Sequence, residues 1–489
     1  MAVRTATTNS ARPFKIPSGL FRILGFGFVS NFEFRSSNFL PVTFLWFLVY
    51  RLYCATSSFR YWTRRRFTAP GLGIVGASVV AALLAPDTEN NVAYQAFTLL
   101  VCLLLVAFVF SWFFTARFSA HRLLPRFGTV GAPLNYSVKL RNLSPKTQKG
   151  LALVENLADP RPAFPEWLAG TLAEDKQIRS FRLGHRPRTN WYRAATLRES
   201  TVPPVPPNQE IEVRAELTPL RRGVLRFNGV TLARPDPLGL FRAFTTIPSP
   251  QSTLVLPKRY PLPPIALPGT MKYQAGGIAL ASNVGQSDEF VALRDYRHGD
   301  PLRHIHWRSW AKAGKPVVRE FEDEFFVRHA LVLDTFSDHP RTDMFEEAVS
   351  VAASFAYSIR TQESLLDLLF VGAESYCFTA GRGLARSDQM LEILASVQTC
   401  RDHLFLELED LVLNHVKVVS GCICVLLAWS EERQKFVEKL LALGVPVLVL
   451  VIVPAGQRDT LEAGPMRDQP GQFHVLEVGQ VEAGLAKLK

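Results

Sequence analysis

The chain has 489 residues, of which 48% are hydrophobic and 20% are charged, and its formal net charge at neutral pH is +12. This length allows two or three domains, and the apolar content fits a folded core together with membrane segments. Much of the positive excess lies beside apolar runs, which favours an anionic lipid surface over nucleic acid as the binding partner.

Residues 1–66 are expected to form a basic N-terminal tail with a possible interfacial helix. Residues 1–35 carry five basic side chains against the single acid Glu33, which fits a disordered basic tail or, alternatively, a transit peptide. Residues 36–50 are uncharged but too few to span a bilayer, so we expect a helix in the membrane interface. A third membrane span over residues 36–55 is the open alternative.

Residues 67–116 predict two transmembrane helices. Residues 67–86 are uncharged for twenty positions and residues 90–116 for twenty-seven, so each stretch can cross about 30 Å of hydrocarbon as a helix. The short link between them predicts a tight helical hairpin. The alternative is a pair of buried helices in a soluble core.

The charges around this hairpin predict its orientation. The link carries only the acids Asp87 and Glu89, whereas basic residues flank both helices. These basic residues are Arg60, Arg64, Arg65, Arg66, Arg117, His121, Arg122 and Arg126. Because cytoplasmic flanks are enriched in arginine and lysine, we expect a multi-pass protein of the inner (cytoplasmic) membrane with its soluble domains in the cytoplasm.

Residues 117–256 show the alternation of a β-sandwich-like domain. Apolar and polar residues alternate around Tyr136 and again over residues 211–217, which is the period of a half-buried strand. Residues 159–207 are rich in proline, arginine and aromatic residues without a clear period, so we interpret them as an insertion. Residues 257–286 are rich in proline, glycine and alanine and should form a linker.

Residues 287–324 combine charged and aromatic residues more densely than any other stretch. Asp300, followed by proline, predicts a helix start in which its carboxylate caps free N–H groups. Gly314 should end this helix, and residues 315–324 should form a strand. We expect the helix to carry three side chains inward: Leu302, Ile305 and Trp310.

The charged groups of this stretch predict partial pairing and an external contact. Burial of so many charges is tolerable only where they pair, so Asp300 should be satisfied within the fold. Arg294 and Arg303 are then the candidates for contact with an acidic partner. His304 and His306 lie two positions apart, which on a helix points them to different faces, so a surface or interdomain role is favoured over a metal site.

Residues 325–489 predict a doubly wound α/β domain. Continuous apolar runs over residues 365–371, 422–428 and 445–453 are typical of parallel strands covered on both faces. Helical stretches at about 388–398, 404–416 and 431–443 separate the later runs. Cys422 and Cys424 share one face of a strand without zinc-knuckle spacing, so we interpret them as structural thiols.

The central stretch resembles the signature of the domain of unknown function 58 family, membrane proteins often paired with MoxR-type AAA+ ATPases. The residues that match are Phe290, Arg294, Tyr296, Gly299, Asp300, Arg303, Ile305, Trp307, Ala311 and the strand over residues 317–322. His306 and Trp310 depart from the usual pattern. Two further stretches resemble the second family signature, residues 221–223 and 236–241, although aspartate, proline and glycine are also ordinary turn residues.

The resemblance implies that the α/β domain is von Willebrand factor A-like, a fold that often binds a divalent ion through an Asp-x-Ser-x-Ser loop. Here the loop begins at Asp334, and Phe336 stands at a position that should supply oxygen. Asp334 and Asp338 are therefore candidates for a degenerate site only, and we predict no bound metal and no cofactor. Asp334 could instead cap a helix or pair with a base from the central stretch.

No nucleophile elbow or Walker loop occurs in the sequence, so we predict that the protein is not an enzyme. The resemblance implies a membrane-anchored, cytoplasmic-facing interaction or scaffold protein that works with a MoxR-type AAA+ ATPase in protein assembly or maturation. The candidates for partner binding are Arg294, Tyr296, Gly299, Asp300, Arg303 and Trp307. The alternatives are a metal-dependent ligand-binding von Willebrand factor A-like module and a hydrolase that uses residues of the central stretch.

Overall fold

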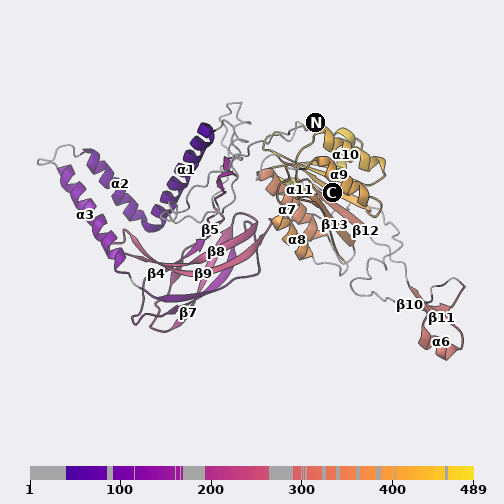
Figure 1. The fold of residues 1–489 in the computed structure, drawn as a ribbon, viewed down its shortest axis with the longest axis horizontal. Coiled ribbons are helices and arrows are strands. Elements are labelled where there is room, and N and C mark those ends of the chain that lie inside the picture. The colour runs from indigo at the N-terminus through magenta and orange to yellow at the C-terminus, as the bar shows by residue number, and fades with distance from the viewer. Residues whose placement is uncertain are drawn as a thin grey trace, which may run out of the picture. The chain divides into compact units, whose positions relative to one another are not determined.

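The computed structural model of the chain is drawn in Figure 1. It describes residues 40–84, 92–114, 116–159, 161–165, 167–168, 193–263, 290–298, 300, 302, 305–321, 327–337, 342–359, 364–381, 387–401, 403–457 and 461–488. The expected basic tail, most of the expected insertion and most of the expected linker lie outside these residues. The chain divides into two units, Met1–Tyr53 and Cys54–Lys489.

Helix α1 (Leu40–Arg66) is longer than the interfacial helix expected from residues 36–50. The uncharged run ends at Arg51, but the helix continues because no glycine or proline follows within it. Three arginines occupy its last turn, where positive charge is favoured by the helix dipole. The apolar run therefore marked only the first part of this element.

The expected pair of transmembrane spans is not supported. Helix α2 (Ala69–Leu84) has 16 residues and helix α3 (Val92–Trp112) has 21, and the two lie side by side (Figure 1). Within the described ranges, only Val92–Ser111 is long and apolar enough to cross a membrane. Helix α2 covers roughly 24 Å, short of a hydrocarbon core of about 30 Å. It begins late because Phe67 forms a β-bridge with Phe241.

Two antiparallel-rich sheets follow the helices and enclose one apolar core. The first has the order β1 (Phe118–Leu123), β3 (Leu134–Asn142), β7 (Glu210–Pro219), β5 (Ala195–Leu197). The second has the order β2 (Phe127–Thr129), β9 (Arg242–Leu256), β8 (Gly223–Pro235), β4 (Leu151–Leu157), β6 (Ser200–Val202). Strand β3 alternates buried and exposed residues, as its sequence predicts. Strands β5 and β6 lie inside residues 159–207, so the end of the expected insertion belongs to the sheets.

A six-stranded sheet forms the last third of the chain. Its order is β14 (Ser375–Ala380), β13 (Ser364–Val371), β12 (Val327–Leu333), β15 (Gly421–Leu426), β16 (Val447–Val453), β17 (Phe473–Glu477). All neighbouring strands are parallel except β13 and β14. Every residue of β16 is buried, as expected for a strand covered on both faces.

Helices cover both faces of this sheet, which has its own core. Together with the two earlier sheets around a separate core, it makes the chain multidomain with mixed sheets. One face carries α7 (Asp343–Ser358), α8 (Ser387–Ser396) and α11 (Val481–Leu485). The other carries α9 (Phe405–His415) and α10 (Glu431–Ala442). Cys422 and Cys424 are both buried in the core under α9 and α10, which confirms that they share a face of β15.

Candidate functional site

The central stretch forms a small module of its own. Strands β10 (Phe290–Asp295) and β11 (Val317–Phe321) pair antiparallel, and helix α6 (Trp307–Ala313) lies in the connection between them. Ile305 bridges to Val318 and both are buried, so they form the module's small core. The connection is also fastened to β11 by the N–H of His306, which donates to the carbonyl of Val317 at 2.8 Å. We call residues 290–321 the signature module.

Asp300 does not cap helix α6. Its two carboxylate oxygens accept from the guanidinium of Arg294 at 2.7 and 2.8 Å, and one also accepts from the N–H of Arg297 at 2.8 Å. The hydrogen bonds from Arg294, with that from Arg297, lower the pKa of Asp300 to about 2. Helix α6 begins only at Trp307, with His306 at its N-cap position, so Asp300 does not cap this helix as expected. Its carboxylate forms a bidentate ion pair with Arg294 instead.

Arg294 therefore forms an ion pair within the module, and its contact with an acidic partner stays a prediction. The ion pair joins the end of β10 to the connection before α6, and it is only partly exposed. Tyr296 lies beside this ion pair, half-buried, with its N–H bonded to the carbonyl of Pro316 at 3.0 Å. Gly299 and Arg303, the other two polar-loop candidates, lie outside the described residues.

Trp307 is the exposed one among the candidates that the structure describes. Its side chain is 64% exposed and stacks on Trp310, with ring centroids 5.2 Å apart and planes 17° from parallel. Gly314 ends the helix in the left-handed region at a φ of 67°, as predicted from the sequence. Leu302, expected to point inward, is 68% exposed. A seven-residue helix on a two-stranded hairpin has too little surface to bury all of these side chains.

The described histidines of the central stretch do not lie within helix α6. His306 precedes α6, and its Nδ1 lies 2.6 Å from the Oγ of Ser309. His298 is exposed in the turn after β10, and His304 lies outside the described residues. Within the described part of the chain, no group of three or more metal-binding side chains is present.

Asp334, the candidate metal ligand, is fully buried directly after β12 and already pairs with an arginine side chain. Its Oδ2 accepts from the Nε of Arg433 at 2.7 Å and from the N–H of Leu427 at 3.0 Å. Its Oδ1 accepts from the N–H of Phe336 at 3.0 Å. Asp334 therefore pairs with a base, but the base comes from α10 and not from the central stretch. Asp338 lies outside the described residues.

Sequence reasoning missed Arg433. This arginine follows two glutamates in the first turn of α10, where a positive charge is disfavoured by the helix dipole. This positive charge at an unfavourable position was the sequence signal that could have identified Arg433 as the partner of a buried acid. Its guanidinium stacks on the ring of Phe405 at 4.8 Å and donates to the Oγ of Ser430 at 3.1 Å, so it is held on several sides.

The second signature joins other parts of the chain together. The carboxylate of Asp236 accepts from the N–H groups of Leu238, Leu240 and Phe241 at 2.9, 2.7 and 2.6 Å, which shapes the turn. The turn meets the start of α2, where a Cβ on Gly71 would come within 2.1 Å of the carbonyl oxygen of Leu240. Glycine is therefore required there for close approach.

The other half of this signature reaches the α/β sheet. The guanidinium of Arg222 pairs with Glu346 of α7 and donates to the carbonyl of Val397 at 2.6 Å. It also stacks on the ring of Phe345 at 5.0 Å. Each half of the signature thus contacts another part of the described chain: the turn at residues 236–241 contacts α2, and Arg222 contacts α7.

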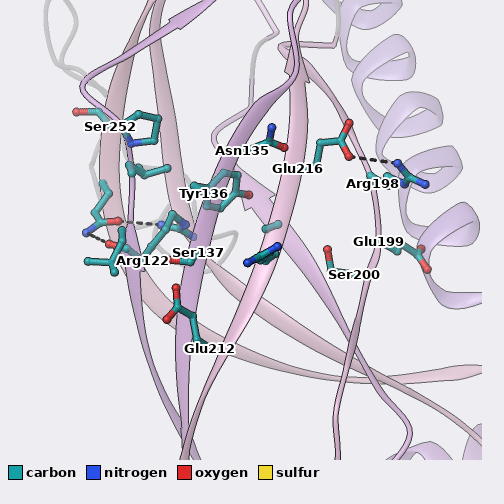
Figure 2. A pocket seen from close by; sticks show the side chains of 16 residues that line it. Arg122, Asn135, Tyr136, Ser137, Arg198, Glu199, Ser200, Glu212, Glu216 and Ser252 are labelled. Carbon is teal, nitrogen blue, oxygen red and sulfur yellow. Dashed lines mark hydrogen bonds and ion pairs between the residues drawn. The ribbon is translucent and has the colours of Figure 1, made fainter.

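A cavity of about 1170 Å³ lies at the β-sandwich-like region, and no sequence pattern indicated it. Arg122 at its wall is buried and donates to Glu155 at 2.6 and 3.2 Å, and Tyr136 donates to the same carboxylate at 2.9 Å. Burial and the negative charge of Glu155 raise the pKa of Tyr136. The pair Arg198–Glu216, 3.2 Å apart, lies on the other side of the cavity (Figure 2). Arg122 is therefore neutralised by Glu155, and Arg198 by Glu216.

Comparison with known proteins gives a partial match. The model of the family described as "Protein of unknown function DUF58" matches residues 292–426, which include most of the signature module and the strands β12 to β15. The uncharacterized protein YeaD of Bacillus subtilis (strain 168) is 28% identical over 184 residues. That alignment covers 37% of this chain and 44% of YeaD, so this chain matches less than half the length of its curated relative.

Likeness to solved structures is weak. A CARDB domain from Pyrococcus furiosus is 10% identical, covers 29% of this chain and 94% of its own, and has a TM-score of 0.14. A cohesin module of a Clostridium perfringens ATCC13124 family 33 glycoside hydrolase is 10% identical, with coverages of 29% and 98% and a TM-score of 0.15. At such scores these likenesses bear on neither the fold nor the ligands of this chain.

Proposed function

We propose that this chain is a membrane-anchored interaction or scaffold protein whose signature module binds a MoxR-type AAA+ ATPase in the cytoplasm. The apolar helix Val92–Ser111 supplies the anchor. The acids Asp87 and Glu89 precede this helix and the basic residues Arg117 and Arg126 follow it, which supports a cytoplasmic placement of the sheets that follow. The partner follows from the resemblance to the domain of unknown function 58 family.

The observation that carries the proposal is the exposed Trp307, stacked on the partly buried Trp310, on a module held by its own internal contacts. An exposed tryptophan stacked on a second one offers a large, rigid apolar surface, and tryptophan is enriched among residues that dominate binding energy. The Arg294–Asp300 pair and the Ile305–Val318 bridge hold this surface in one geometry before binding. Such preorganisation lowers the entropy cost of association. Arg303 stays a candidate contact.

We also propose that the six-stranded sheet is von Willebrand factor A-like. Numbered along the chain, its strands follow the order 3-2-1-4-5-6, with the third strand antiparallel at the edge. A doubly wound sheet of this order changes direction between β12 and β15, where ligand sites commonly form. In this chain Asp334 lies there bound to Arg433, which argues against the metal-dependent alternative.

The proposal is tested by co-purification of the full chain in detergent with a MoxR-type ATPase from the same organism. Trp307→Ala should reduce recovery of the ATPase about tenfold or more, because it removes the exposed anchor. The melting temperature should stay near that of the wild type, since the side chain is mostly exposed. Leu443→Ala, which removes an exposed apolar side chain from the α/β domain, is the matched control. Full recovery with Trp307→Ala would remove the module as the docking surface.

A further inference from the structure

Arginine side chains gather where the α2–α3 segment meets the β-sheets. Helix α1 ends on three arginines, and the bridge between Phe67 and Phe241 brings this end beside the start of β9. At the far end of α3, the guanidinium of Arg234 lies 5.8 Å from the ring centre of Phe114. These charges therefore lie at the level where α2 begins and α3 ends.

Aromatic rings and main-chain carbonyls hold two of these arginines in place. Arg66 stacks on Phe244 at 4.5 Å, and its guanidinium donates to the carbonyl of Arg242 at 3.4 Å. Arg65 donates to the carbonyl of Glu155 at 3.1 Å and to the hydroxyl of Tyr61 at 2.7 Å. The Nε of each arginine is buried and has no hydrogen-bond partner among the described residues.

Two acids linked to the partners of these arginines already form ion pairs of their own. The carboxylate of Glu155, whose carbonyl meets Arg65, is bound by Arg122 at 2.6 Å and by Tyr136. Glu199 is bound by Arg242 at 2.7 Å. Arg65 and Arg66 thus have no carboxylate partner in the described part of the chain. Burial, together with the charge of Arg65, lowers the pKa of Arg66.

Two adjacent, partly buried guanidinium groups without a counter-ion are costly unless an anion completes them. Guanidinium groups match the geometry of phosphate, to which they donate paired hydrogen bonds. We infer that Arg65 and Arg66 form a binding site for the phosphate of an anionic phospholipid headgroup. This inference rests on the membrane anchoring in the proposed function.

Two features favour a lipid over free phosphate as the occupant. The site lies at the end of the apolar helices, where headgroups would be found if α3 crosses a bilayer. Tyr61 and Trp62 beside it are 53% and 43% exposed, and exposed tyrosine and tryptophan at a helix end are typical of the membrane interface.

The test measures the melting temperature of the full chain in non-ionic detergent against short-chain phosphatidylglycerol, short-chain phosphatidylcholine and inorganic phosphate. We expect a saturable rise with phosphatidylglycerol alone. In the double variant Arg65→Gln, Arg66→Gln the apparent affinity should fall roughly tenfold or more, because charge-assisted hydrogen bonds are lost. Arg198→Gln, which removes an exposed arginine paired with Glu216, should leave it unchanged.

An equal response to phosphatidylcholine, an equal response to inorganic phosphate, or full affinity in the double variant would overturn the inference. If the double variant does not fold, mass spectrometry of lipids retained by the wild type decides, and the absence of phosphatidylglycerol enrichment would overturn it. Alkaline carbonate extraction separates the two proposals. A chain released from membranes refutes the anchoring, whereas a chain that stays but ignores phosphatidylglycerol refutes only the headgroup site.

Discussion

Arginine–aspartate pairs occur both in the α/β domain and in the signature module, in opposite surroundings; Asp334–Arg433 and Asp300–Arg294 are one of each kind. In the sheet, the side chain of Asp334 is fully buried and that of Arg433 is 10% exposed. In the module, the side chains of Asp300 and Arg294 are 16% and 32% exposed. Their distances are the same, 2.7 Å, so geometry alone does not distinguish them. The difference in solvent access separates a pair that supports a core from a pair that orders a surface loop.

The largest effect is expected from breaking the buried pair. Asp334→Ala leaves the guanidinium of Arg433 buried without its partner, which should destabilise the fold by about 3–5 kcal/mol. Chemical denaturation of the full chain in detergent measures this loss. The double variant Asp334→Ala, Arg433→Met should recover much of it, because no charge is then stranded. A double variant as unstable as the single one would contradict this account.

A smaller effect is expected from breaking the exposed pair. Asp300→Ala should loosen residues 290–321 but leave the unfolding midpoint of the α/β sheet unchanged, because water can solvate the freed Arg294. Hydrogen exchange followed by mass spectrometry should show faster exchange in module peptides only. Lys315→Ala, which removes the more exposed pair with Asp295, is the matched control and should change less. Faster exchange in sheet peptides of Asp300→Ala would contradict this account.

Acid should act on the module through Asp300. Its pKa in the folded chain is about 2, below the ordinary value of 3.8. A carboxyl with a lowered pKa stabilises the fold above its unfolded pKa and loses that contribution as the pH falls toward its folded pKa. Pepsin cleavage within residues 290–321 should therefore rise between about pH 4 and pH 2. Asp300→Asn should be cleaved readily already at pH 4, and parallel profiles would refute the role of this carboxyl.

The smallest effect is expected from added metal. Because Arg433 and two N–H groups occupy the oxygens of Asp334, magnesium or calcium at micromolar concentration should produce no saturable heat in titration calorimetry. Arg433→Ala, tested under the same conditions, frees the carboxylate and shows whether the surrounding loop can hold an ion. A stoichiometric site in the wild type that disappears in Asp334→Ala would restore the metal-dependent alternative.

Local patterns in the sequence predicted the local structure well. Apolar runs marked the buried strands, alternation marked β3, and Gly314 ended its helix, because one-sided burial and turn conformations are properties of neighbouring residues. The motif over residues 290–322 also pointed to the family whose model matches residues 292–426.

Partnerships between distant residues were decided by the tertiary structure. Arg433 lies 99 positions from Asp334, so their pairing depends on the path of β12, β15 and α10. The sequence predicted that Asp300 caps a helix, but the hairpin places Arg294 beside its carboxylate. The start of α2 likewise depends on the pairing of Phe67 with Phe241. A side chain with several possible partners takes the one that the fold brings within reach, and sequence spacing does not contain that distance.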